Sequence, residues 1–241
     1  GTANENIVTI TNSTVNLSKN INDPYYGLTG GVGYEGGAQY NQVIITNSII
    51  SGNVYGAYIY NNNGQLAIDN NITITGSSNI ANANLYGYDT NSGATGSKNT
   101  LTLNGWSGST KSVQNFNNIN FENIKWNNDG TVLNITGNTE NGALADTNIN
   151  LNSLNFVGGA ELNTGESMTI ISNNDLGKDL GKDLGIGTGT GKIDALSNFT
   201  AGVAIEGTGT AEVASDGNSV KYTLTEVKHL DQIDLVAENR A

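Results

Sequence analysis

Short segments of this chain repeat at intervals of about thirty residues, and this repetition limits the possible folds more than any other feature. The letters ITNS occur at 10–13 and again at 45–48, and the related segments ITGS, LNGW and ITGN follow. The apolar residues that open these segments advance in steps of 35, 29, 29 and 32 and are Ile10, Ile45, Ile74, Leu103 and Ile135. Self-similarity at such a period indicates a stack of units that bury their apolar sides against their neighbours.

A set of aromatic residues repeats in a second register with nearly the same period. Tyr26, Tyr55, Tyr86 and Phe116 follow one another at steps of 29, 31 and 30 residues. Because the apolar set and the aromatic set recur with nearly the same spacing, both support a single repeat unit of about thirty residues. We therefore expect each set to form a ladder, in which equivalent side chains of successive coils stack on one another.

The segments themselves have the pattern of short strands. IVTIT, ITITG and LTLNG alternate apolar with polar residues, and turn segments such as NNNG and NSGATGS separate them. The chain has forty asparagines and 32 glycines, residues that favour turns. These features predict an all-β fold, a right-handed parallel β-helix whose coils contain about 30 residues and lie about 4.8 Å apart. An antiparallel β-sandwich is the alternative, because the same turn segments occur in hairpins.

Three regions can be separated along the chain. Residues 1–175 carry the coils, with a loop rich in glycine and tyrosine expected at 19–41. Residues 176–192 form a low-complexity loop of glycine, lysine and aspartate. Residues 193–241 contain longer alternating segments with hairpin signals, which predict a C-terminal β cap over the open end of the rod.

Composition excludes several functions. A net charge of −12 opposes binding to nucleic acid, which requires a basic surface. The absence of cysteine excludes disulfides and thiolate metal sites. The one histidine, His229, has no serine in a nucleophile-elbow motif as a partner. We therefore expect no enzymatic activity, no catalytic residue, no metal and no cofactor.

Tyrosines are concentrated in the first part of the chain, where nine of the ten lie between residues 25 and 88. Three of the nine belong to the aromatic ladder, and the others cannot all occupy the same interior line. Exposed tyrosines among asparagine and glycine offer contact area with a hydrogen-bonding tip. The remaining six form a candidate binding surface, with ladder packing and loop anchoring as the alternative: Tyr25, Tyr34, Tyr40, Tyr58, Tyr60 and Tyr88.

Four segments resemble the C-terminal portion of the passenger domain of a bacterial type V autotransporter. They are NTLTLNG at 99–105, GTVLNITGN at 130–138, GESMTIIS at 165–172 and the closing segment at 219–241. The resemblance implies that 193–241 is an autochaperone-like cap. It also implies that the chain is part of a longer protein, linked to an outer-membrane β-barrel and exported to the bacterial cell surface.

Most passenger domains of this kind are adhesins, so the resemblance implies a non-catalytic, monomeric adhesin or stalk. Its partner would be a protein or glycan on the surface of a host cell or of another bacterium. The alternative is a carbohydrate-active β-helix enzyme, a lyase or hydrolase, which would require a cluster of carboxylates. Asp231 and Asp234 are the isolated pair that could supply two of them.

Overall fold

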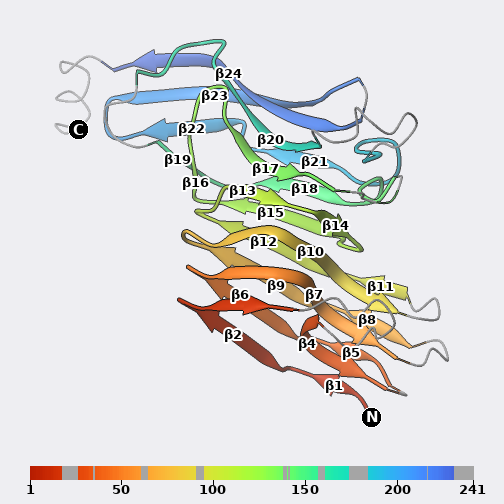
Figure 1. Ribbon diagram of the computed structural model, residues 1–241. Helices are drawn as coiled ribbons and strands as arrows, with labels where there is room; N and C mark the ends of the chain where they lie inside the picture. Colours follow the sequence, from red (N-terminus) through yellow and green to blue (C-terminus); the bar gives the residue numbers. More distant parts are fainter. Residues whose placement is uncertain are drawn as a thin grey trace, which may run out of the picture.

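The computed structural model shows an all-β protein in which every regular element of the described ranges is a strand. The structure describes residues 1–17, 27–34, 36–60, 65–90, 95–137, 140, 142–156, 161–173, 184–215 and 217–230. Successive coils stack from the N-terminal end toward a curled sheet at the C-terminal end (Figure 1). No helix long and apolar enough to cross a membrane occurs in these ranges.

The coils place their strands in parallel sheets along the rod. The longest sheet has seven strands in the order β2 (Ile7–Thr11), β6 (Gln42–Thr46), β9 (Asn71–Thr75), β12 (Thr100–Asn104), β15 (Asn118–Glu122), β18 (Asn148–Leu151) and β21 (Ile193–Ala195). A four-stranded sheet contains β1 (Ala3–Asn4), β5 (Ala38–Gln39), β8 (Leu66–Ile68) and β11 (Thr95–Ser97). All pairings in these two sheets are parallel.

Three further sheets complete the fold. A five-stranded parallel sheet runs in the order β14 (Ser112–Gln114), β10 (Asn79–Thr90), β7 (Ile49–Ile59) and β3 (Thr14–Asn16), and β4 (Gly27–Gly33) also pairs with β7. A two-stranded sheet joins β16 (Ile124–Lys125) to β19 (Leu154–Asn155). The six-stranded sheet has the order β13 (Gly108–Thr110), β17 (Thr131–Ile135), β20 (Ser167–Asn173), β24 (Ser219–His229), β23 (Ile205–Val213) and β22 (Asn198–Ala201).

The predicted parallel β-helix with a C-terminal cap is therefore confirmed, and the sandwich alternative is wrong for the coils. The change from coil to cap occurs at β20, which pairs in parallel with β17 and antiparallel with β24. From there β24, β23 and β22 form an antiparallel meander that curls over the last coil. Antiparallel strands joined by short turns can cover the open end of a coil without needing another coil.

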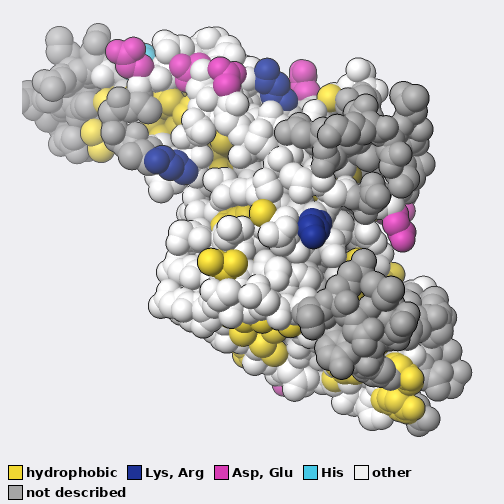
Figure 2. Space-filling view, in the orientation of Figure 1, with side chains coloured by type: hydrophobic (Ala, Val, Ile, Leu, Met, Phe, Trp, Pro, Cys, Tyr) yellow, Lys and Arg dark blue, Asp and Glu magenta, His cyan; other side chains and the backbone are white. Residues whose placement is uncertain are grey.

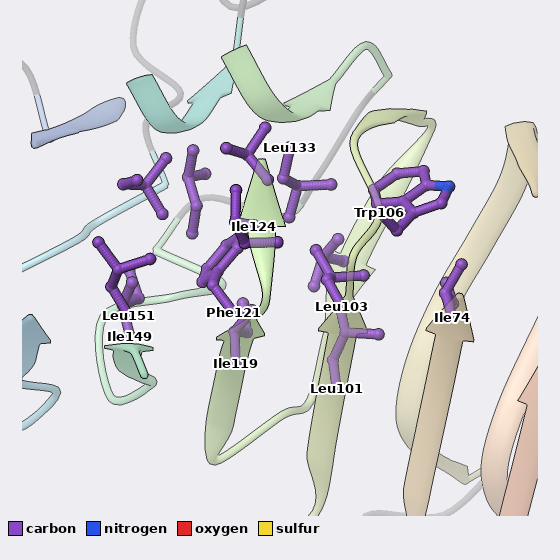
Figure 3. Packing of buried hydrophobic residues seen from close by; sticks show 14 of the residues in the cluster. Ile74, Leu101, Leu103, Trp106, Ile119, Phe121, Ile124, Leu133, Ile149 and Leu151 are labelled. Atoms are coloured by element: carbon purple, nitrogen blue, oxygen red, sulfur yellow. The ribbon is translucent and has the colours of Figure 1, made fainter. Parts of the chain in front are cut away.

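The interior apolar ladder follows the register of the seven-stranded sheet. Ile10, Ile45, Ile74 and Leu103 lie opposite one another in successive strands. The next positions belong to the residues Phe121 and Leu151. The side chains of this ladder point into the rod, where they pack against residues from the other sheets (Figure 3).

The expected place of Ile135 in this ladder is wrong. Ile135 ends β17 and lies opposite Thr110 and Asn173 in the six-stranded sheet. The fourth coil is short because β14 leads directly into β15, with no strand of the four-stranded sheet between them. The step to the next coil is therefore only 18 residues, from Asn99 to Asn117. A residue about thirty positions further along the chain lies past the equivalent position in that coil.

A second ladder consists of asparagine side chains at the corner before the seven-stranded sheet. The Nδ2 of Asn41 donates to Oδ1 of Asn70 at 2.8 Å, and the Nδ2 of Asn70 donates to Oδ1 of Asn99 at 2.9 Å. Each Oδ1 also accepts the backbone N–H of the asparagine in the preceding coil. The three residues are fully buried, so each amide depends on the coils above and below it for its hydrogen bonds.

Two of the expected regional boundaries differ in the structure. The segment 19–41, expected to be a loop, contains β4 and β5. β4 is rich in glycine and so lacks the alternation of apolar and polar residues by which a strand is predicted. Gly31 has no room for a Cβ, because the Asn41 amide lies against it. At the other end, β21 pairs in parallel with β18 and so belongs to the coils, although it lies in the segment expected to be the cap.

Replacing Asn70 with alanine should destabilise the protein strongly. The change removes four side-chain hydrogen bonds to buried groups of Asn41, Asn99 and Ala38, and it leaves the backbone N–H of Asn41 without its acceptor. We expect a loss of about 4 kcal/mol in the free energy of unfolding, measured with urea. The matched control is Asn71→Ala on the outer face of β9, which should change stability by less than about 0.5 kcal/mol. Equal losses for the two variants would contradict a structural role of the ladder.

Candidate tyrosine binding surface

Parallel pairing of β4, β7 and β10 brings tyrosines of different coils together on the five-stranded sheet. Tyr55 of β7 lies opposite Tyr86 of β10, and their rings stack with centroids 5.0 Å apart. On the far sides, Thr29 lies opposite Tyr55 and Gln114 lies opposite Tyr86. This aromatic stack therefore contains two rings in the described part of the chain, and Tyr26 lies outside the described residues.

Phe116 does not continue the aromatic stack, contrary to the sequence expectation. The place opposite Tyr86 belongs to Gln114, and Phe116 lies beyond the end of β14. Its ring is buried in the main apolar core. The step from Tyr86 to its partner Gln114 is 28 residues, so a spacing of thirty residues points two positions too far along the chain.

Tyr55 and Tyr86 are packing residues. Tyr55 is almost fully buried, and its hydroxyl accepts a hydrogen bond of 2.7 Å from Nδ2 of Asn53. Burial raises the pKa of the Tyr55 phenol well above its usual value, and the Asp89 carboxylate raises it further. The same two causes, in the same order, raise the pKa of Tyr86. Both phenols therefore stay neutral inside the sheet.

Tyr58 does not lie on the surface, so its assignment to the binding surface is wrong. Its side chain is only 2% exposed. In the sheet it lies between Val32 of β4 and Asp89 of β10, and its ring meets the Tyr55 ring edge-on at 5.5 Å. The neighbouring coils cover the ring from both sides. Alternation within one strand indicates which face a side chain occupies, but not whether other coils cover that face.

Tyr88 anchors a second, smaller core. It lies opposite Ala57 and packs against a cluster of buried residues from the four- and five-stranded sheets, namely Ala38, Ala57, Ile59 and Ala67. Gly96 approaches the Tyr88 ring so closely that a Cβ at that position would collide with it. The close approach of Gly96 makes Tyr88 a structural residue that is half-buried at the side of the rod.

Tyr34 and Tyr60 form a stacked pair just past the ends of β4 and β7, in which Tyr34 is exposed and Tyr60 half-buried. The N–H of Tyr60 donates to the carbonyl of Gly33 at 2.9 Å, which continues the parallel pairing past both strands. The two rings stack with centroids 4.8 Å apart and planes 13° from parallel. Tyr34 is 54% exposed, and Val32, two residues earlier on the same face, is 48% exposed. We call Val32, Tyr34 and Tyr60 the tyrosine platform.

The other two candidates lie apart from the platform or outside the described residues. Tyr40 is 49% exposed, but it stands at the corner between β5 and β6, where its backbone has a left-handed φ of 58°. Its N–H donates to the carbonyl of Ile68, so the corner is tied to the next coil. Tyr25 lies outside the described residues. Of the six candidates, the structure thus brings two together at the surface.

The one histidine and several glutamates, residue types suited to catalysis or metal binding, lie in the cap. His229 ends β24 and is exposed. Glu206 and Glu226 line one hollow of the cap together with Lys228, whose Nζ lies 3.4 Å from Oε1 of Glu226. In the described ranges, no cluster of three or more histidine, aspartate or glutamate residues could hold a metal ion. Asp231 and Asp234 lie outside the described residues.

Sequence reasoning missed one concave feature, which lies where the last coil meets the cap. Its walls come from segments about 45 residues apart in the chain, such as those of Asn152 and Asn198. No local motif marks them. Comparison of the chain with protein-family models, curated proteins and solved structures finds no significant match. Geometry and chemistry must therefore carry the functional argument.

The raised phenol pKa of Tyr55 predicts a loss of stability in alkaline solution. The unfolded phenol titrates near pH 10, and the folded one at higher pH, so folding favours the protonated form. This contribution is complete below about pH 10 and is lost as the pH rises through the folded pKa. Tyr55→Phe should therefore lose less stability than the unmodified chain between pH 9 and pH 12. Urea unfolding at several pH values checks this, and parallel pH profiles would refute it.

Proposed function

We propose that this protein is a non-catalytic adhesin of the bacterial cell surface that binds glycans through the tyrosine platform. The observation that carries the proposal is the exposed ring of Tyr34 stacked on the half-buried ring of Tyr60 on the side of a rigid rod. The rings are held in place by the strands that precede them. Little conformational freedom of the rings would be lost when a ligand contacts them, so the entropy cost of binding would be low.

The chemistry around the platform fits a neutral sugar. Tyrosine rings offer flat apolar faces to the C–H side of a pyranose, and their hydroxyls can bond to sugar hydroxyls. Val32 extends the apolar area on the same face. Neither β4 nor β7 contains a charged residue, so the platform would not require a charged partner. A protein receptor is the other possible partner and is distinguished below.

The rod gives this platform a mechanical role. Each coil is held to the next by parallel strand pairing and by buried ladders, so the platform keeps a constant orientation relative to the rod axis. Single-site contacts of this size are weak. Many copies on one cell would convert weak contacts into stable attachment, because linked sites bind at high effective concentration.

The passenger domain of a type V autotransporter is the setting that the architecture supports best. Parallel coils rich in asparagine, glycine and threonine lead into an antiparallel cap, the order that the resemblance of the sequence implies. In this proposal the chain is exported and displayed as a monomer outside the cell. The absence of cysteine is compatible with that route, because no disulfide could form before export is complete.

Replacing both platform tyrosines with serine should weaken binding to cells. We expect Tyr34→Ser combined with Tyr60→Ser to reduce the apparent affinity of the fluorescently labelled chain at least about tenfold, the scale of a buried aromatic hot spot. Binding would be measured by flow cytometry on epithelial cells and on bacteria. Tyr40→Asn is the matched control, because Tyr40 is similarly exposed but lies outside the platform.

Treatment of the target cells separates glycan from protein receptors. Periodate cleaves sugar diols and should abolish binding, whereas mild protease treatment should leave part of it. Binding that survives periodate but not protease would replace the glycan by a protein partner. Equal binding by the platform variant and the unmodified chain, with circular dichroism unchanged, would refute the proposed site.

A further inference from the structure

Three hollows meet where the last coil joins the cap. One of about 410 Å³ lies between β18 and the segment 194–198, and one of about 180 Å³ lies between β19 and β22. A third, of about 440 Å³, lies over β22, β23 and β24. All three share Asn198 as a wall residue. The hollows therefore adjoin one another around β22, and we call them together the coil–cap groove.

The free edge of a sheet borders this groove. β22 is the last strand of the six-stranded sheet in the described part of the chain. The N–H of Gly209 donates to the carbonyl of Ser197, which sets the alternation of hydrogen bonds between β22 and β23. The backbone groups of Asn198 and Thr200 consequently point away from β23 and toward the groove. Two N–H groups and two carbonyls are thus presented along one line.

A second strand edge stands across the groove from β22. β19 pairs with β16 on one side, and its residue Leu154 lines the same hollow as Asn198 and Thr200. Figure 1 shows β19 and β22 near each other at the base of the cap. A strand placed in this hollow would lie beside the edge of β22 with β19 across from it, and addition of a strand to an exposed sheet edge is a recurring mode of peptide recognition.

The floor of the groove is aromatic. The rings of Phe156 and Phe199 lie 4.8 Å apart, and the Phe156 ring lies 5.7 Å from that of Trp126. Phe199 and Phe156 both line the hollow between β19 and β22. Alternate side chains of an extended segment point to opposite faces, so every second one would meet this apolar floor.

The rim carries an excess of negative charge. Asp194, Glu206 and Glu226 line the hollows, and one lysine, Lys228, opposes them while pairing with Glu226. Acidic side chains also gather along the cap over β23 and β24 (Figure 2). The whole chain has a net charge of −12. Side chains that project from a bound segment toward the rim would therefore be favoured if they were basic.

We propose that the coil–cap groove binds an extended segment of a partner protein, with alternating apolar and basic residues, as an added strand on the edge of β22. Backbone hydrogen bonds to Asn198 and Thr200 hold the segment, the aromatic floor takes its apolar side chains, and the acidic rim takes its lysines or arginines. This site lies at the cap, and its existence does not depend on glycan binding by the tyrosine platform.

The test uses labelled peptides and the full chain. A fluorescein-labelled hexapeptide of alternating valine and lysine should bind saturably in a fluorescence anisotropy titration, and its affinity should fall as salt is raised. The matching peptide of valine and glutamate should not bind. Equal binding of the two peptides, or no binding of the basic one, would overturn the proposal.

Two variants test the backbone edge and the rim separately. Thr200→Pro removes an N–H that points into the groove and spares the hydrogen bonds to β23, which an edge strand tolerates. It should weaken the basic peptide about threefold to tenfold, the effect of one lost hydrogen bond. Glu206→Gln should weaken it about threefold at low salt, whereas the control Glu212→Gln, on the same strand outside the groove, should not.

Unchanged peptide affinity in the Thr200→Pro variant, with its circular dichroism and thermal midpoint retained, would overturn strand addition. Self-association is measured in parallel by size-exclusion chromatography with light scattering. A dimer that Thr200→Pro dissociates would identify a second copy of the chain as the occupant of the edge and would overturn the proposed partner.

Discussion

The asparagine ladder is the interaction on which the rest of the structure depends. The amides of Asn41, Asn70 and Asn99 are fully buried, and each finds its hydrogen-bond partners in the neighbouring coils. A slip of one residue between coils would bury these amides without partners and would also turn the apolar side chains outward. The ladder therefore holds a single register, and the parallel sheets and the stacked rings follow from it.

The ladder also explains why the corner before it tolerates such different residues. Tyr40, Asp69 and Lys98 occupy equivalent corner positions, and all three have left-handed backbone conformations with φ near 58°. That conformation is unfavourable for a tyrosine or a lysine. The asparagine that follows each corner residue compensates for this cost, so the corner side chain itself is free to vary. Tyr40 is exposed for this geometric reason and needs no ligand to explain it.

Position along the rod decides which tyrosines can interact with other molecules. Tyr55 and Tyr58 lie between coils and are covered by them, whereas Tyr34 extends past the end of its strand and is exposed beside the half-buried Tyr60. At the opposite end of the rod, the repeat stops at β20 and an antiparallel meander takes over. That change leaves β22 with an unpaired edge among the described strands. One candidate site therefore lies at the side of the stacked coils, past the ends of two strands, and the other lies where the regular stacking of coils ends.

The sequence by itself determined the all-β class and the presence of a cap, and it favoured parallel coils over a sandwich, because alternation and a thirty-residue repeat are together typical of stacked short strands. It also determined that Ile45, Ile74 and Leu103 would share an interior ladder. The tertiary structure alone decided where the repeat is broken, as with Ile135 and Phe116. It likewise decided that Tyr58 is buried and that Asn152 faces Asn198 across a groove. Those outcomes depend on which residues stack between coils of unequal length, and no local pattern in the chain records that.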